Sequence, residues 1–105
     1  MDIKTEIQLE FTVENIHKVI QWGAMGSSSP YSHRSIADWC ERFWNKYSDI
    51  DAPSGTERYM PLLAEIESEW DIYEAWYSEQ HPHAVQAAPL LPEHYFKKWL
   101  EQLNA

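Results

Sequence analysis

The sequence predicts an all-α fold, a four-helix bundle-like single domain over residues 1–105. Apolar residues recur at helical spacing in four segments, and the chain holds only 3 glycines, too few for a sandwich with many tight turns. With 105 residues, 44% of them hydrophobic, the chain can bury one modest core. The 6 Trp, 6 Tyr and 3 Phe predict that this core is rich in aromatic rings.

The first segment, residues 3–11, fits two structures. If it is extended, its apolar side chains share one side, but Ile3, Ile7 and Phe11 also follow a helical spacing of four. We favour an extended N-terminal arm. Thr12 then has the character of an N-cap, with Phe11 before it and Ile16 after it at the positions of a hydrophobic staple.

Four amphipathic helices follow from the apolar periodicity. Ser35, with Asp38 three residues on, predicts the start of the second helix, whose polar face also carries Glu41. Pro61 and Pro92 suit the first turns of the third and fourth helices. The helices are expected at residues 12–22, 35–48, 61–78 and 92–103, with connections at 26–30, 49–55 and 81–91. The residues expected to be mostly buried are Ile36, Trp39, Phe43, Tyr47, Ile66, Trp70, Tyr73, Phe96, Trp99 and Leu100.

Charge and cysteine content limit the function. The formal net charge is −9, which repels nucleic acid and anionic membranes and attracts basic partners. The same charge could equally serve solubility alone. No apolar run is long enough to span a membrane. One cysteine, Cys40, permits no internal disulfide, and the polar N-terminus does not resemble a signal peptide, so we expect a cytoplasmic protein.

The distribution of acids is the strongest functional signal. Residues 59–96 contain no Lys or Arg but seven acids, so the third helix lacks the mixed charges that normally support an exposed helix. At helical spacing these acids fall on two flanks of the core stripe, one of which also carries Ile72 and Trp76. A Trp among carboxylates is typical of a site for a basic protein. The predicted partner-binding residues are Glu65, Glu69, Asp71, Glu74 and Trp76. The alternative is that Trp76 packs under the connection at 81–91 and that the acids are simply solvated.

Catalytic and cofactor sites are not expected. The acids gather on one helix rather than on opposing walls of a cleft, and the chain has no Gly-rich phosphate loop. Cys40 lies on an apolar stripe, where a thiol acts as a small hydrophobic group. His81 and His83 could supply two metal ligands, but the sequence has no familiar metal-binding spacing. We therefore expect a protein that is not an enzyme, with no cofactor and no metal.

Residues 35–77 carry a resemblance to a known class. The segment from Ser35 to Trp44, followed by Leu62 to Tyr73 with its Trp-Asp-Ile-Tyr ending, resembles small immunity proteins of the colicin D type and of contact-dependent inhibition systems. This resemblance implies a cytoplasmic helical bundle whose acidic surface covers the basic active site of a toxin nuclease.

The sequence thus leaves three functions open. The first is an immunity or inhibitor protein that binds a basic toxin domain, without direct contact to nucleic acid or membrane. The second is an acidic regulatory or adaptor protein that binds another protein or forms a homodimer. The third is a nucleic-acid mimic, although the mixed charges of the first 58 residues fit it less well.

Overall fold

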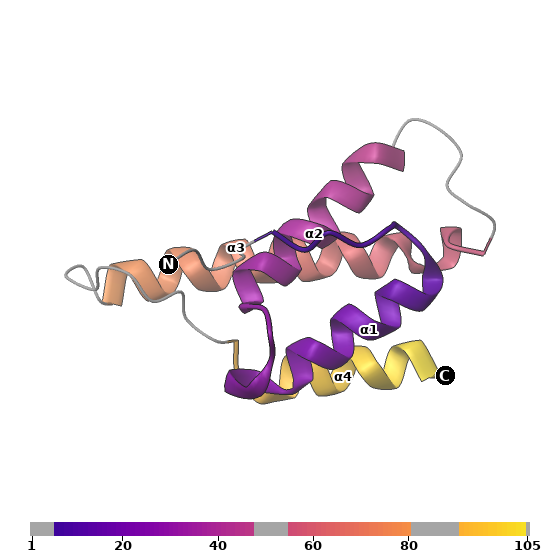
Figure 1. Ribbon diagram of the computed structural model, residues 1–105. Coiled ribbons are helices and arrows are strands. Elements are labelled where there is room, and N and C mark those ends of the chain that lie inside the picture. Colours follow the sequence, from indigo (N-terminus) through magenta and orange to yellow (C-terminus); the bar gives the residue numbers. More distant parts are fainter. Residues whose placement is uncertain (1–5, 48–54, 81–90, 105) are drawn as a thin grey trace.

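The computed structural model describes residues 6–47, 55–80 and 91–104, and it confirms the all-α fold (Figure 1). Over these residues the chain forms four α-helices, two short 3₁₀ helices and no strand. The α-helices are α1 (Val13–Ala24), α2 (His33–Tyr47), α3 (Met60–Gln80) and α4 (Glu93–Asn104), and the 3₁₀ helices are η1 (Gly26–Ser28) and η2 (Glu57–Tyr59). Each α-helix coincides with a predicted one to within two residues at either end.

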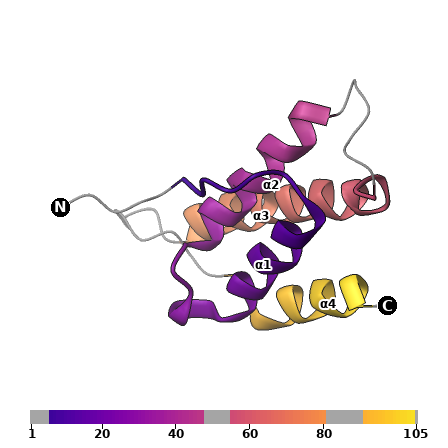
Figure 2. The same cartoon turned by 45° about the vertical axis from the view of Figure 1, so that its right-hand side comes forward.

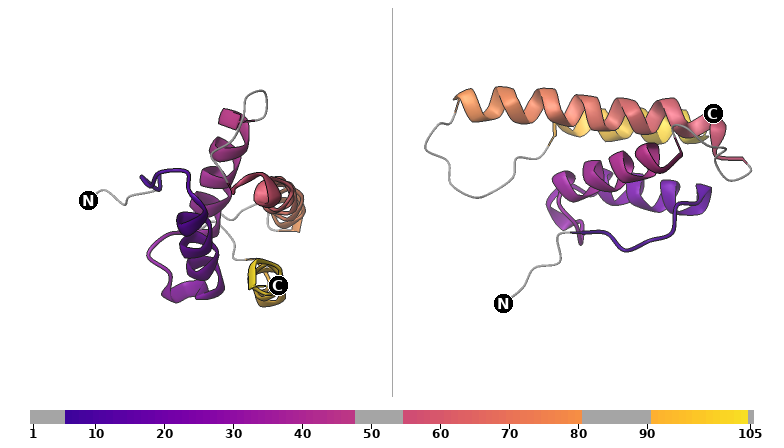
Figure 3. Two further views of the ribbon diagram at one scale, coloured as in Figure 1. Left: turned by 90° about the vertical axis from the view of Figure 1, so that its right-hand side faces the viewer. Right: turned by 90° about the horizontal axis from the view of Figure 1, so that it is seen from above.

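The four helices form two pairs, α1 with α4 and α2 with α3. The members of each pair run in opposite directions, and the two pairs pack on one another (Figures 1 and 2). Helix α3 is the longest, and its C-terminal end projects past the other three helices, as the view from above in Figure 3 shows. The predicted connections at 49–55 and 81–91 lie almost entirely outside the described residues.

The extended arm before α1 is confirmed for residues 6–11, which are neither helix nor strand, while residues 3–5 lie outside the described part. The arm packs along α2. Its backbone carbonyls at Ile7 and Leu9 accept hydrogen bonds from the side chains of Arg42, at 3.1 Å, and Trp39, at 3.2 Å. The Phe11 ring lies 5.5 Å from that of Trp39. The backbone of the arm is thus satisfied by a helix rather than by a second strand. Side chains of α2 donate hydrogen bonds to its carbonyl oxygens.

The caps of α1 and α2 show one correct prediction and one wrong one. Thr12 caps α1, since its hydroxyl accepts a hydrogen bond from the backbone N–H of Asn15 at 3.1 Å. Helix α2 begins at His33, two residues before the predicted Ser35. The cap is Ser32, whose hydroxyl accepts from the N–H of Ser35 at 3.1 Å, so Ser35 lies buried within the first turn.

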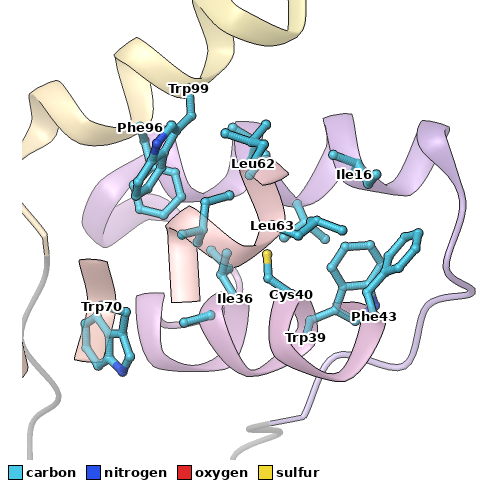
Figure 4. Packing of buried hydrophobic residues seen from close by; sticks show 14 of the residues in the cluster. Ile16, Ile36, Trp39, Cys40, Phe43, Leu62, Leu63, Trp70, Phe96 and Trp99 are labelled. Atoms are coloured by element: carbon cyan, nitrogen blue, oxygen red, sulfur yellow. The ribbon is translucent and has the colours of Figure 1, made fainter. Parts of the chain in front are cut away.

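The core lies between the two helix pairs and is aromatic, as predicted (Figure 4). Trp39, Phe43 and Trp99 are fully buried, and their rings contact other rings edge-on. Of the ten residues predicted to be mostly buried, seven are below 5% exposed: Ile36, Trp39, Phe43, Ile66, Trp70, Phe96 and Trp99. The other three, Tyr47, Tyr73 and Leu100, are half-buried and pack against the edge of the core.

A buried histidine joins three parts of the chain. The Nδ1 atom of His33 accepts a hydrogen bond from the backbone N–H of Leu91 at 2.8 Å, so Nε2 must carry the ring proton and donate it to the Gly23 carbonyl at 2.9 Å. The His33 ring also lies 4.5 Å from that of Phe96. One neutral imidazole thus holds together the start of α2, the end of α1 and Leu91, which lies two residues before α4.

Candidate protein-binding surface on helix α3

The five predicted binding residues lie on α3, but on two opposite flanks rather than on one surface. Glu65, Glu69 and Trp76 share one flank by helical spacing, and Glu65 on this flank contacts residues of α4. Asp71 and Glu74 share the flank that faces α2 and line a groove with α2 residues. The two-flank arrangement predicted from helical spacing is therefore correct, whereas a single continuous site built from all five residues is not what the structure contains.

Glu65 is engaged within the protein itself. Its carboxylate accepts a hydrogen bond from the buried indole N–H of Trp99 at 3.0 Å and lies 3.1 Å from the ammonium group of Lys98. These contacts, the indole N–H first among them, lower the pKa of Glu65. This carboxylate therefore joins α3 to α4.

Glu74 also has a partner within the chain. It forms an ion pair with Arg34 near the start of α2, in which the side chains are 31% and 61% exposed. An exposed pair of this kind is worth at most about 1 kcal/mol, so a competing cation could replace Arg34 at little cost. Glu69 is half-buried one turn after Glu65 and has no basic partner among the described residues.

A surface groove of about 290 Å³ lies where α2 and α3 meet. Most of its charged walls are acidic: Asp38 and Glu41 come from α2, and Glu67 and Asp71 come from α3. Its full lining is Arg34, Ala37, Asp38, Glu41, Glu67, Trp70, Asp71 and Glu74. Within the described part of the chain, Arg34 is the only basic side chain that lines the groove. Because Arg34 pairs with Glu74, and Asp38 with Arg42 at 2.9 Å, the groove keeps three carboxylates that no Lys or Arg of the described residues neutralises, those of Glu41, Glu67 and Asp71.

The repulsion within this groove is visible in the protonation of Glu67. A hydrogen bond shared with Asp71, together with desolvation and the nearby charges of Asp71 and Glu41, raises the pKa of Glu67 to about 7. Glu67 holds a proton near neutral pH because no cation of the described segments lies beside it. A Lys or Arg side chain of a partner could displace this proton and form an ion pair with the carboxylate.

Glu67 is not among the predicted binding residues. The sequence pattern places Asp38 in the first turn and Glu41 on the polar face of the second helix, and it assigns neither to a site. The residues on α3 could have been found from the missing basic charges. Those on α2 could not, because nothing in a single sequence says which flank of α3 faces which face of α2.

An aromatic ridge lies in the C-terminal half of α3, the helix whose end projects past the bundle (Figure 3). We use this name for Ile72, Tyr73, Trp76 and Tyr77. Ile72 is 66% exposed and Trp76 is 50% exposed, whereas the two tyrosines are half-buried. The Tyr73 ring lies 5.5 Å from that of Trp76 and 6.3 Å from that of Tyr77, so the aromatic side chains support one another.

The described residues offer no metal site, because they contain no group of three or more His, Cys, Asp or Glu side chains arranged to hold an ion. His81 and His83 lie outside the described residues. The thiol of Cys40 is fully buried, and burial raises its pKa well above the usual range, which makes it a poor nucleophile. Within the same described segments, no helix has the length and apolar character needed to cross a bilayer.

Comparison with known proteins finds no match for this chain among protein-family models, curated proteins or solved structures.

Proposed function

We propose that this protein binds a basic protein partner through the acidic groove between α2 and α3, and that it acts by binding rather than by catalysis. The observation that carries the proposal is the excess of carboxylates in the groove: three of its five acids have no cationic neighbour among the described residues. Like charges held close together destabilise a free protein, and a partner that brings cations relieves this repulsion on binding.

The particular partner that we propose is a toxin domain, which would make this protein an immunity protein. Two considerations support it. The resemblance to immunity proteins covers residues 35–77, and the groove is built from α2 and α3 within the same region. A nuclease toxin needs a basic active site to hold phosphates, and the groove has the complementary charge. A regulatory or adaptor protein for another basic partner is the second candidate, because the groove would serve it equally well.

The test uses substitutions that remove charge with little change of shape. Glu67→Gln and Asp71→Asn are made singly and together. The matched control is Glu101→Gln, which removes one negative charge at an exposed position of α4. Partners are captured from the native host on the immobilised parent protein, and the affinity of the purified partner for each variant is then measured by calorimetry.

We expect a basic partner, and a loss of about 2–5 kcal/mol of binding free energy when a carboxylate that faces a desolvated cation is removed. Glu101→Gln should change only the association rate and its dependence on salt. If the double variant binds as tightly as the parent, or if the captured partner is itself acidic, the proposal is wrong. A captured protein that cleaves RNA or DNA, and that the parent inhibits, would decide for the immunity function over the adaptor.

A further inference from the structure

Ile72 and Trp76 of the aromatic ridge form a second exposed feature of α3. Ile72, 66% exposed, and Trp76, 50% exposed, are the two most exposed large apolar side chains of the described residues. Both lie in the C-terminal half of α3, the helix whose end projects past the other three (Figures 1 and 3). Large apolar groups that stay exposed next to one another commonly mark a surface for another molecule.

The side chains of the ridge are pre-organised for contact with another molecule. Ile72 and Trp76 are four residues apart, so they lie one above the other on the same side of the helix. The Trp76 ring also packs at 5.5 Å against that of Tyr73. A large ring held by a neighbour loses little conformational freedom on binding, and tryptophan and tyrosine are among the residues that contribute most to protein interfaces.

The charge around the ridge indicates the kind of partner. Helix α3 contains no Lys or Arg, and Glu69 and Glu79 lie on the same side of the helix as the ridge, three residues before Ile72 and three residues after Trp76. A second copy of this chain would set these acids against their own counterparts, with a formal charge of −9 on each molecule. A partner segment with apolar side chains flanked by Lys or Arg would instead satisfy both the ridge and the acids beside it, and its cations could also lie over the Trp76 ring.

We propose that the aromatic ridge is the apolar anchor for a basic amphipathic helix of the same partner that the groove binds. This inference rests on the proposed function and adds to it the shape of the partner: cations that enter the groove, and a helix with an apolar face that packs on Ile72 and Trp76. The groove would supply charge recognition, and the ridge would supply the buried apolar contact.

The experiment uses a defined probe in place of the natural partner. The probe is a peptide of about 18 residues, built of Leu and Lys at helical spacing. Its counterpart has Glu in place of Lys. Binding is measured by calorimetry near physiological ionic strength, where the Debye length is about 8 Å and weak long-range attraction is screened.

Three variants separate the ridge from general exposure. Trp76→Ser and Ile72→Ser each remove an apolar group from the ridge, and both sites are exposed enough that folding should not change, which circular dichroism and thermal melting check. Met25→Ser is the matched control, because Met25 is 49% exposed at the end of α1, outside the ridge.

We expect the cationic peptide to bind the parent and the Met25→Ser variant alike, and to bind Trp76→Ser at least tenfold more weakly, with a smaller loss for Ile72→Ser. The Glu-containing peptide should not bind. Equal binding by the parent and Trp76→Ser, or failure of the parent to bind the cationic peptide, would overturn the proposal. So would a parent that sediments as a dimer and becomes a monomer on Trp76→Ser substitution, because the ridge would then be a self-association surface.

The groove variants separate this result from the proposed function. If Glu67→Gln with Asp71→Asn weakens binding of the captured partner and Trp76→Ser does not, the groove proposal stands and the ridge proposal fails. If only Trp76→Ser weakens it, the ridge proposal stands and the groove proposal fails.

Discussion

Gly23 sits where a side chain has no room. A Cβ atom added at this position would come within 2.1 Å of the Phe96 ring, so the end of α1 and the start of α4 approach more closely than any other residue would allow. The same glycine offers its carbonyl to His33. Its lack of a side chain is thus what allows α4 to lie against α1 with Phe96 only 1% exposed.

We therefore predict that Gly23→Ala destabilises the protein by about 1–3 kcal/mol, the usual cost of forcing an extra carbon into a packed core. The measurement is urea unfolding followed by circular dichroism. The control is a double-mutant cycle: in a Phe96→Ala background, Gly23→Ala should cost much less, because the ring that it meets is gone. Equal costs in the two backgrounds would show that the contact does not explain the glycine.

Helices α3 and α4 are joined by the contact between Glu65 and Trp99. Of these two residues, Glu65 is the one that the sequence predicts to bind a partner. The loss of this contact should therefore be seen in folding. We predict that Glu65→Ala lowers the free energy of unfolding by about 1–3 kcal/mol, because the buried indole N–H loses its acceptor. Glu65→Gln keeps an oxygen at the same place and should recover most of this loss. Chemical denaturation of the two variants compares them, and identical stabilities would mean that the hydrogen bond contributes nothing.

The four helices could be predicted because each carries its own apolar stripe, which a single sequence displays in full. The start of α2 could not, because Ser32 and Ser35 are equally good caps in isolation. The choice follows from His33, which must enter the helix to reach Gly23 and Leu91. Such a contact joins residues far apart in the sequence, and no local pattern records it.

The candidate site was predictable to a similar depth. The absence of basic residues marks α3 as unusual, and the helical spacing separates its two flanks. The loss of Glu65 to α4 and the gain of Asp38 and Glu41 from α2 both depend on how the helices pair. Helical spacing places Trp76 at the edge of the core stripe but leaves its burial open, and the structure leaves it 50% exposed.

At the scale of the whole molecule, two buried or crowded groups act on stability in opposite directions as the pH changes. Burial lowers the pKa of His33 below its ordinary 6.5, so the unfolded chain takes up the proton first and stability is lost as the pH falls below about 6.5. The pKa of Glu67 is raised from 4.5 to about 7, so its protonated form is favoured in the folded state. Stability from Glu67 is lost as the pH rises from 4.5 through 7.

The effect of His33 is best measured where Glu67 no longer titrates. In a Glu67→Gln background, we predict that the free energy of unfolding falls more steeply between pH 6.5 and pH 5 with His33 than with His33→Gln. The difference in slope should not exceed about 1.4 kcal/mol per pH unit, the limit for one proton. The cause is specific: a proton on Nδ1 would face the N–H of Leu91, and the link to α4 would break. Parallel slopes would contradict it.

The position of Cys40 has a consequence for how the motions of this protein can be followed. It is the only sulfhydryl in the chain, and it is fully buried on α2 at the centre of the core. A thiol reagent can reach it only while the helices are apart. The rate of modification therefore counts how often the core opens, in the way that amide hydrogen exchange does for a backbone group. Cys40 is therefore a built-in probe of transient opening of the core. A bound partner that stabilises the packing of α2 on α3 should slow the labelling of Cys40, with no engineered tag.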